Sequence, residues 1–237
     1  MASNDFLMTL PETERTSLMA LARPAIIPSG TDLFLPGDSV DWVYFPLGGL
    51  VSLICVMLNG DQAETGVVGR EGAVGLLEAA GSGILRYRAV VQIDLDTIKV
   101  PASHYLQLLG RSVPLQTAVA SHLELTIAEA RQTIACHAHH PARGRLAWWL
   151  LECQDRTGLE TLRLTQEFLA AMLGVQRTTV VDVATLLKDS GLIQYRRGAI
   201  TILDRPGLER ASCECYATIA GYRHRIAASA QSRTTRQ

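Results

Sequence analysis

The sequence predicts an α+β protein. An N-terminal antiparallel β roll of the double-stranded β-helix type is expected to precede a long central helix and a C-terminal winged helix-turn-helix. Residues 23–100 consist of short apolar runs broken by glycine, proline, asparagine and aspartate, a pattern typical of antiparallel strands. Residues 112–139 follow a helical pattern throughout. Residues 166–185 have the spacing of two short helices that meet at a glycine, and a basic hairpin follows them.

The β roll and a short helix before it are assigned to residues 1–112, as a sensor or effector domain. The helix is expected over residues 11–22, with Leu18 on its apolar side. Turn signals then recur about every 8–12 residues, and Asn59-Gly60-Asp61 has the composition of a hairpin turn. The LLEAAG run after Gly75 predicts one helical turn within the roll.

The central helix is predicted over residues 113–140, as a dimerisation helix. Pro114 suits its first turn, and Pro141 ends it because a proline disfavours helical geometry at the preceding His140. Apolar side chains recur at three- and four-residue steps: Leu115, Val119, Leu123, Ala130 and Ile134. Such a stripe packs either on the roll or against a second copy of the chain as a coiled coil. We favour the coiled coil, because the helix pair that follows is of a kind that acts with two-fold symmetry.

The helix-turn-helix lies within residues 141–212. A helix that starts at Pro141 is expected to support it through an apolar face of Leu146, Trp149, Leu150 and Cys153. In QEFLAAMLGVQRTTVVDVAT, the small Ala170 permits two helices to approach closely, and Gly174 lies at the turn between them. The side chains predicted to be buried between the two helices are Leu169, Leu173, Val175, Val180 and Val183.

The second helix of this pair is predicted to expose a polar surface suited to reading base edges in a major groove. The predicted DNA-binding residues are Gln176, Arg177, Thr178, Thr179 and Asp182, together with Thr165, Gln166 and Lys188. The following QYRRGAITIL segment predicts a hairpin that turns at Gly198, with Arg196 and Arg197 at its tip to meet phosphates. An ordinary helical hairpin, or a ligand-binding protein whose winged helix docks on a protein partner, is the alternative. A docking surface would be more apolar.

Charge is distributed in agreement with this interpretation. The formal net charge is −1, but residues 1–142 hold 8 basic and 14 acidic side chains, whereas residues 143–237 hold 14 and 9. The basic surplus therefore lies in the half predicted to bind DNA. The chain contains no GxSxG, HExxH or GxxxxGK[ST] motif, and no histidine precedes His104 to supply a metal centre within the roll. We therefore expect no enzyme. Because no run approaches the ~18 apolar residues of a membrane span and the N-terminus lacks the pattern of a secretory signal, we also expect no membrane partner and a cytoplasmic location.

The whole chain resembles the Crp/Fnr family of bacterial transcription regulators. The resemblance is most specific in LTQEFLAAMLGVQRTTV, LLKDSGLI and YRRGAITI, and it extends to VYFPLGGLVSL and VVGREGAVGL in the roll. It implies a homodimer that binds near-palindromic double-stranded DNA, with RNA polymerase as a candidate further partner. Arg177 keeps the family's guanine-pairing place, whereas Thr178 and Asp182 depart from its usual pattern. The family's usual half-site is therefore not expected.

The sensor function is less clearly specified. By resemblance, a ligand pocket would involve Glu71, Gly72, Arg86, Arg88 and Arg131. The family's usual ribose-holding carboxylate is missing, with Glu71 or Glu78 as a substitute, and neither Arg86 nor Arg88 is followed by the usual serine. Cyclic nucleotide binding is therefore not favoured, and no cofactor is expected. The oxygen-sensing branch holds an iron–sulfur centre through an N-terminal cysteine cluster. The first cysteine here is the single Cys55, so that centre is not expected.

The remaining residues able to carry chemistry lie near the C-terminus and near the hinge, the short segment around His140 and Pro141 between the central helix and the next one. Cys136 and His140 share a helix face and His137 lies near them, so metal binding is one interpretation. A polar hinge is the favoured one. The nearby cysteines of Cys213-Glu214-Cys215 are interpreted as structural, because a bridge between such close neighbours would be strained. Residues 213–237 are assigned to a final helix and a tail that is disordered after about Ala227.

Overall fold

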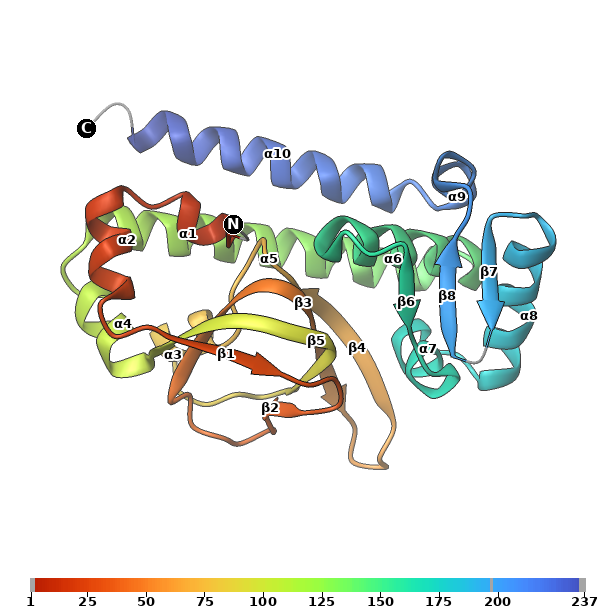
Figure 1. The fold of residues 1–237 in the computed structure, drawn as a ribbon, viewed down its shortest axis with the longest axis horizontal. Helices are drawn as coiled ribbons and strands as arrows, with labels where there is room; N and C mark the ends of the chain where they lie inside the picture. Colours follow the sequence, from red (N-terminus) through yellow and green to blue (C-terminus); the bar gives the residue numbers. More distant parts are fainter. Residues whose placement is uncertain (1–2, 197, 235–237) are drawn as a thin grey trace.

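A computed structural model describes residues 3–196 and 198–234 of the chain. A 27-residue helix, α5 (Val113–His139), runs through the middle of the molecule. A β domain lies along its N-terminal half, and a smaller α/β domain lies near its C-terminal end (Figure 1). The α+β class, the long central helix and the C-terminal helix-turn-helix are confirmed.

The β domain contains a curved sheet in which every strand pair is antiparallel. The strand order is β1-β5-β3-β4, and β2 pairs with β5. Gly60, with a φ of 88°, lies in the turn between β3 and β4, where the sequence predicts a hairpin. The strands are β1 (Arg23–Ile27), β2 (Asp32–Phe34), β3 (Trp42–Val56), β4 (Gln62–Val68) and β5 (Arg88–Pro101).

Short helices close the ends of this sheet around a buried apolar core. Phe45, Leu76 and Tyr105 are among its fully buried side chains. Leu115 and Val119 of α5 belong to the same core, so the first two turns of the predicted stripe pack on the β domain. The helices are α1 (Asp5–Met8), α2 (Glu12–Met19), α3 (Leu76–Ala80) and α4 (Ala102–Leu109).

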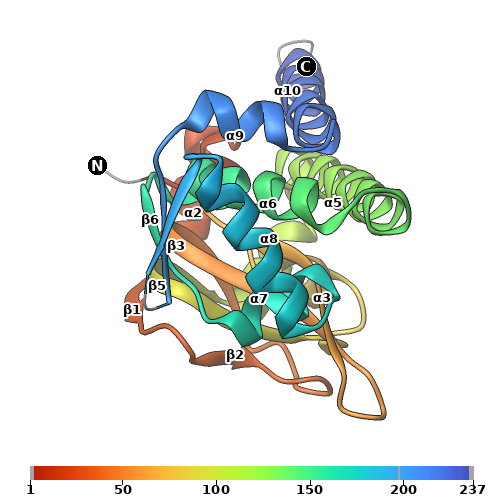
Figure 2. The same ribbon diagram turned by 90° about the vertical axis from the view of Figure 1, so that its right-hand side faces the viewer.

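The second domain has its own apolar core beneath a three-stranded antiparallel sheet of order β6-β8-β7. Leu50 of β3 is buried in this core, so the two domains pack directly on each other. The elements are α6 (Ala142–Thr157), β6 (Thr161–Arg163), α7 (Gln166–Leu173), α8 (Arg177–Asp189), β7 (Ile193–Arg196), β8 (Ala199–Ile202) and α9 (Arg205–Ala211). Figure 2 shows α7 and α8 in front of the β domain.

The last helix, α10 (Cys215–Thr234), runs back along α5 (Figure 1). The backbone is helical through Thr234, whereas the sequence predicts a tail from about Ala227. The apolar side chains Cys215 and Ile219 anchor the first turns of α10. Within the described part of the chain, no helix has both the length and the apolar character required to span a bilayer.

Candidate nucleic-acid interface

Two short helices and the turn between them form the surface for which the sequence predicts DNA binding. The Oγ1 atom of Thr165 accepts a hydrogen bond from the Phe168 N–H at 3.1 Å and so caps α7. Gly174 ends α7 with a φ of 60° and a ψ of 40°, a left-handed conformation that favours glycine. The N–H of Val175 then donates to the carbonyl of Ala170 at 3.1 Å, which fixes the turn before α8.

Helix α8 has one apolar face and one polar face. The buried face consists of Val180, Val183, Ala184 and Leu187. The opposite face exposes Gln176, Arg177, Thr178, Val181, Asp182 and Thr185, and Thr179 is half-buried beside it. The sequence did not single out Val181, because an apolar residue between core valines resembles another core residue. Its 41% exposure makes it an apolar group able to meet a thymine methyl.

Arg177 lies in the first turn of α8 and faces solvent. Its Nη2 atom is 2.9 Å from the Glu167 Oε1 atom of α7, and the two side chains are 62% and 78% exposed. An ion pair this exposed contributes little to stability. The contact instead holds the Arg177 guanidinium beside Glu167 on the solvent-facing surface of the helix pair, where it remains accessible to another partner.

The wing is the hairpin of β7 and β8. It follows α8 and lies against the start of α7. β7 and β8 pair from Ile193 to Arg196, and Gly198 in their turn has a φ of 76°. The N–H of Leu164 donates to the Gly198 carbonyl at 2.7 Å, so the wing turn lies beside the exposed Thr165 and Gln166. Arg196 is exposed at the end of β7, and Arg197 lies outside the described residues.

The far end of α8 lies away from these residues. Lys188 is exposed in the last turn of the helix, roughly 16 Å along the axis from Arg177. The predicted set therefore divides into a main group around the start of α8 and the wing, and the isolated Lys188.

A buried arginine that the sequence did not reveal supports the helix pair from below. Arg145 of α6 is 8% exposed, and its Nη1 atom donates to the Leu173 carbonyl at 2.7 Å. This carbonyl belongs to the last turn of α7, where a cation stabilises the exposed end of the helix. Arg145 thereby fixes α7 to α6, although no local pattern around residue 145 could have predicted its partner.

Two cavities lie between the β domain and the helices beside it. The larger, about 280 Å³, is lined by α1, α5 and α10. The smaller, about 120 Å³, is lined by β4, α5 and α6. Glu71 lines both cavities and Gly72 lines the smaller one.

The three arginines predicted for the ligand pocket lie outside both linings. Arg88 pairs with Asp32 at 2.6 Å on the sheet, and Arg86 and Arg131 are exposed. The three arginines therefore do not join Glu71 and Gly72 in either cavity. Arg88 already has a partner on the strand next to its own, and Arg131 lies on the exposed side of α5.

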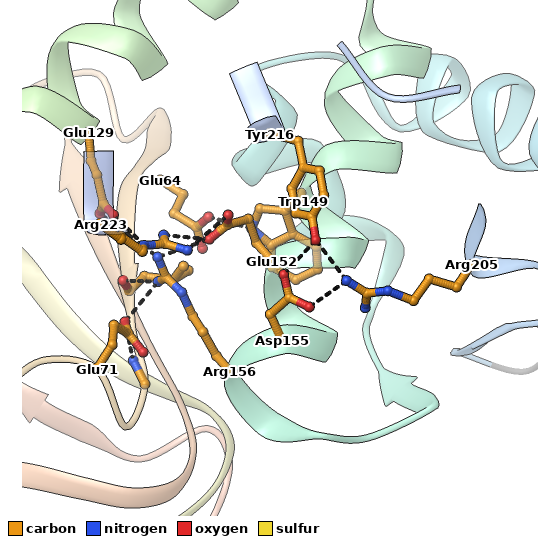
Figure 3. Close-up of polar contacts among 12 residues, drawn as sticks. Glu64, Glu71, Glu129, Trp149, Glu152, Asp155, Arg156, Arg205, Tyr216 and Arg223 are labelled. Carbon is orange, nitrogen blue, oxygen red and sulfur yellow. Dashed lines mark hydrogen bonds and ion pairs between the residues drawn. The ribbon is translucent and has the colours of Figure 1, made fainter. Parts of the chain in front are cut away.

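A network of buried and half-buried charges joins the domains beside the smaller cavity (Figure 3). Arg156 of α6 contacts Glu71 at 3.3 Å and Glu152 at 3.0 Å. Arg223 of α10 contacts the same Glu152 at 2.6 Å and Glu129 of α5 at 2.7 Å. Burial alone would raise the pKa of Glu152, but the two arginines hold it below its ordinary value. The network fastens α6 to the β domain, to α5 and to α10.

A second polar contact joins the domains deeper in the interface. The indole Nε1–H of Trp149 in α6 donates to Glu64 Oε1 of β4 at 2.8 Å. The Oε2 atom of Glu64 is buried without a hydrogen-bond partner. Burial raises the pKa of Glu64 to about 7, against the opposing effects of Ser52, Trp149 and Arg156. Glu64 is therefore an acidic side chain at the domain interface that titrates near neutral pH.

The structure regroups the residues near the hinge. Cys136 and His140 lie close to Cys213 and Cys215, which approach from the other side of the hinge. His137 lies apart from this group. It lines the smaller cavity, and burial followed by the charge of Arg145 lowers its pKa.

The family model of the Crp-like helix-turn-helix domain matches residues 144–211. The chain is 31% identical to the transcriptional regulator SdrP of Thermus thermophilus over 182 residues, which span 74% of this chain and 85% of the relative. It is 26% identical to the cyclic AMP receptor protein of the same organism over 185 residues, with coverages of 78% and 85%.

Solved structures agree with this relationship. A CRP/FNR-family transcriptional regulator from Thermus thermophilus has a TM-score of 0.65 at 28% identity, over 80% of this chain and 98% of that chain. FixK2 from Bradyrhizobium japonicum has the same fold, with a TM-score of 0.70 at 17% identity and coverages of 81% and 98%. The helix-turn-helix, the order of the domains and the identity to SdrP lead to one conclusion. The chain belongs to the Crp/Fnr family of transcription regulators, which are not enzymes.

Proposed function

We propose that the protein acts as a homodimer on a near-palindromic site in double-stranded DNA, with α8 as the helix that reads base edges. The observation that supports this most is the division of α8 into a buried apolar face and an exposed polar face. In a two-fold dimer, two such helices would lie about one DNA turn apart, roughly 34 Å. RNA polymerase is proposed as a further partner, and the cytoplasm, where the target DNA lies, as the location.

The proposed contacts follow from the chemistry of each side chain. Arg177 pairs with a guanine, and Glu167 at 2.9 Å orients its guanidinium. Asp182 accepts from a cytosine amine, while Val181 contacts a thymine methyl. The hydrogen-bonding side chains beside them contact neighbouring bases, and the side chains around the wing contact phosphates, which fix the orientation of the protein on DNA. These are Gln176, Thr178 and Thr179 on the reading helix, and Thr165, Gln166, Arg196 and Arg197 on the phosphates. Lys188 contacts phosphate separately, from the far end of α8.

Replacing Arg177 with alanine is expected to weaken specific DNA binding by about 1–3 kcal/mol. The loss arises because a bidentate contact to guanine disappears, whereas binding to unrelated DNA changes little. The site would first be found by selecting bound sequences from random DNA with the purified protein. Fluorescence anisotropy would then measure the affinity of wild type and variant for that site and for a scrambled duplex.

The matched control is Arg210→Ala, which removes an exposed arginine of α9 away from the reading face. It should bind the selected site like the wild type. If Arg177→Ala also bound it like the wild type, the assignment of α8 as the reading helix would be wrong. If selection enriched no motif, docking of the winged helix on a protein partner would become the better interpretation.

A row of exposed apolar side chains on α5 supports the proposed dimer. Leu123, Ile127 and Ile134 are 44%, 40% and 71% exposed, although Leu115 and Val119 earlier in the helix are buried. The three exposed side chains follow one another at steps of four and seven residues, the spacing of a coiled-coil seam. A second copy of α5 would cover them.

Replacing both Ile127 and Ile134 with glutamate is expected to raise the dimer dissociation constant at least about 100-fold. Each substitution removes apolar burial and introduces a charge at the seam. Sedimentation velocity over a range of protein concentrations would measure the change. The control is Ala135→Glu, an exposed position on α5 next to Ile134 but turned away from the seam. A wild type that stayed monomeric at all concentrations, or a double variant that dimerised as well as the control, would contradict the proposal.

We propose that the sensor domain does not bind a cyclic nucleotide at its interface with α5. The relative named cyclic AMP receptor protein is named for a ligand with an anionic phosphate, which needs a free cation. Here Arg156 and Arg223 are both already paired with buried carboxylates, and Glu71 is paired with Arg156. An incoming phosphate would have to break these ion pairs and lie among the remaining acidic groups.

A further inference from the structure

Four metal-ligating side chains meet where α5 ends and α10 begins. Cys136, His140, Cys213 and Cys215 each place one ligand atom within 4.8 Å of all the others. The Sγ atoms of Cys136 and Cys213 are 3.5 Å apart, and Cys215 Sγ is 3.4 Å from His140 Nδ1. Pro141 contributes, because His140 has left the helix with a φ of −103° and a ψ of 141° and its ring turns toward the sulfur atoms.

The size of this cluster fits one tetrahedral ion. Zinc lies about 2.3 Å from a thiolate sulfur and about 2.0–2.1 Å from an imidazole nitrogen, so its ligand atoms lie roughly 3.5–3.8 Å from one another. The two contacts of 3.5 and 3.4 Å are close to that spacing. Three thiolates and one imidazole also form a typical closed zinc set. An iron–sulfur cluster contains several atoms and would hold its cysteines farther apart.

The surroundings of His140 independently favour a metal ligand. Its Nε2 atom is 3.0 Å from the Oε1 atom of Glu214, so the Nε2–H donates to a carboxylate and the Nδ1 lone pair faces the cysteines. Metal-bound histidines in proteins commonly donate their other ring N–H to a carboxylate in this way. In addition, the Gln132 side-chain amide donates to Cys215 Sγ at 3.1 Å, a contact that stabilises a thiolate.

The cluster is also sheltered from water. Cys136 and Cys215 are fully buried and Cys213 is 8% exposed, and the side chains of Trp148 and Ile219 complete an apolar shell around them. A shell of this kind limits the access of solvent and competing ligands.

The cluster touches the DNA-binding domain directly. The Cys213 N–H donates to the Gly144 carbonyl of α6 at 3.4 Å. A Cβ atom on Gly144 would lie only 3.3 Å from Cys213 N, so the first turn of α6 packs closely against the cluster. The four ligands therefore lie between the end of α5, the hinge and the start of α10.

We propose that Cys136, His140, Cys213 and Cys215 form a structural Zn²⁺ site that fixes the hinge between α5 and α6 to the start of α10. The three thiols release their protons to solvent as the ion binds. Four protein ligands fill a tetrahedral sphere, so the site has no open position for a substrate. The bound ion sets the direction in which α6, and with it the helix-turn-helix, leaves the central helix.

The test uses the full-length protein, purified without oxygen from zinc-supplemented cultures. Mass spectrometry of the metals should find about one zinc per chain. After chelation, added Co²⁺ should give the visible absorption of a tetrahedral, thiolate-bound ion. Cys213→Ser and His140→Ala should lose both signals. Their matched controls, Cys55→Ser and His139→Ala, should retain both, because Cys55 lies in β3 and His139 is exposed next to the ligand.

A milder variant keeps the test informative even if a ligand substitution prevents folding. Glu214→Gln removes only the negative charge of the partner of the His140 ring, at an exposed position, and should weaken Co²⁺ affinity about 10–100-fold. The proposal is overturned by wild-type protein without zinc, by iron together with acid-labile sulfide, or by a Cys136–Cys213 disulfide in metal-free protein. Unchanged Co²⁺ affinity in Glu214→Gln would overturn it as well.

Discussion

Arg156→Met is expected to destabilise the protein by about 3–5 kcal/mol at neutral pH, the largest effect of any single substitution proposed for this chain. The Arg156 side chain is 5% exposed and faces three carboxylates, those of Glu71, Glu129 and Glu152. Without it, Arg223 alone balances all three. Methionine fills similar space but supplies no charge, so buried carboxylates remain uncompensated or must take up protons.

Urea denaturation followed by tryptophan fluorescence would measure this loss, because Trp148 and Trp149 lie on the same helix as Arg156. The matched control is Arg70→Met, which removes an arginine that is 54% exposed and 3.7 Å from Asp5. It should change stability by less than about 1 kcal/mol. Equal effects of the two substitutions would show that the buried network does not hold the domains together.

Glu64→Gln is expected to remove a pH dependence of stability between pH 4.5 and pH 7. Burial raises the pKa of Glu64 from 4.5 to about 7 in the folded protein, so in this window the folded state keeps a proton that the unfolded state releases. The free energy of unfolding therefore falls as the pH rises through the window and is flat above it. The difference between the two pKa values corresponds to about 3 kcal/mol.

The comparison is made between wild type and Glu64→Gln at each pH, because other groups titrate equally in both proteins. The glutamine oxygen still accepts the Trp149 N–H but cannot ionise. Relative to the variant, the wild type should lose stability as the pH rises from 4.5 to 7. Glu160→Gln, at an exposed position, should follow the wild type. If the free energies of unfolding of wild type and Glu64→Gln changed in parallel with pH, Glu64 would not titrate in this range.

The helix-turn-helix could be predicted from the sequence because its determinants are local. Ala170 and Gly174 are four residues apart, and the apolar positions around them follow the helical repeat. The hairpin at Gly60 was predicted for the same reason. In each case a few neighbouring residues determine the backbone conformation, and the rest of the fold needs only to be compatible with it.

The central helix shows where local pattern becomes insufficient. Its periodicity identified an apolar face, but not what covers that face. Leu115 and Val119 are buried in the β domain while Ile134 remains 71% exposed, because the helix extends beyond the end of the sheet. A single stripe therefore has two different environments along its length.

The polar groups that join the domains had one local signal, the pair of Glu152 and Arg156 four residues apart on α6, and that pair does not predict the other partners. Arg156 and its partners come from four separate segments, and Glu129 and Arg223 are 94 residues apart. Cys136 and Cys213 are separated by 77 residues, so each was interpreted only beside its sequence neighbours. Their meeting depends on α10 returning along α5, an arrangement that no residue spacing encodes.

The adjacent indoles of α6 give this molecule a natural optical reporter at two places. Trp149 contacts Glu64 at the face shared with the β domain, whereas the neighbouring Trp148 packs beside Cys136 and Cys213. Emission from a variant that keeps only the first would follow the seating of the β domain. Emission from a variant that keeps only Trp148 would follow the chemistry of the thiols. Fluorescence without an added label can therefore follow the packing of the β domain and the state of the cysteines separately.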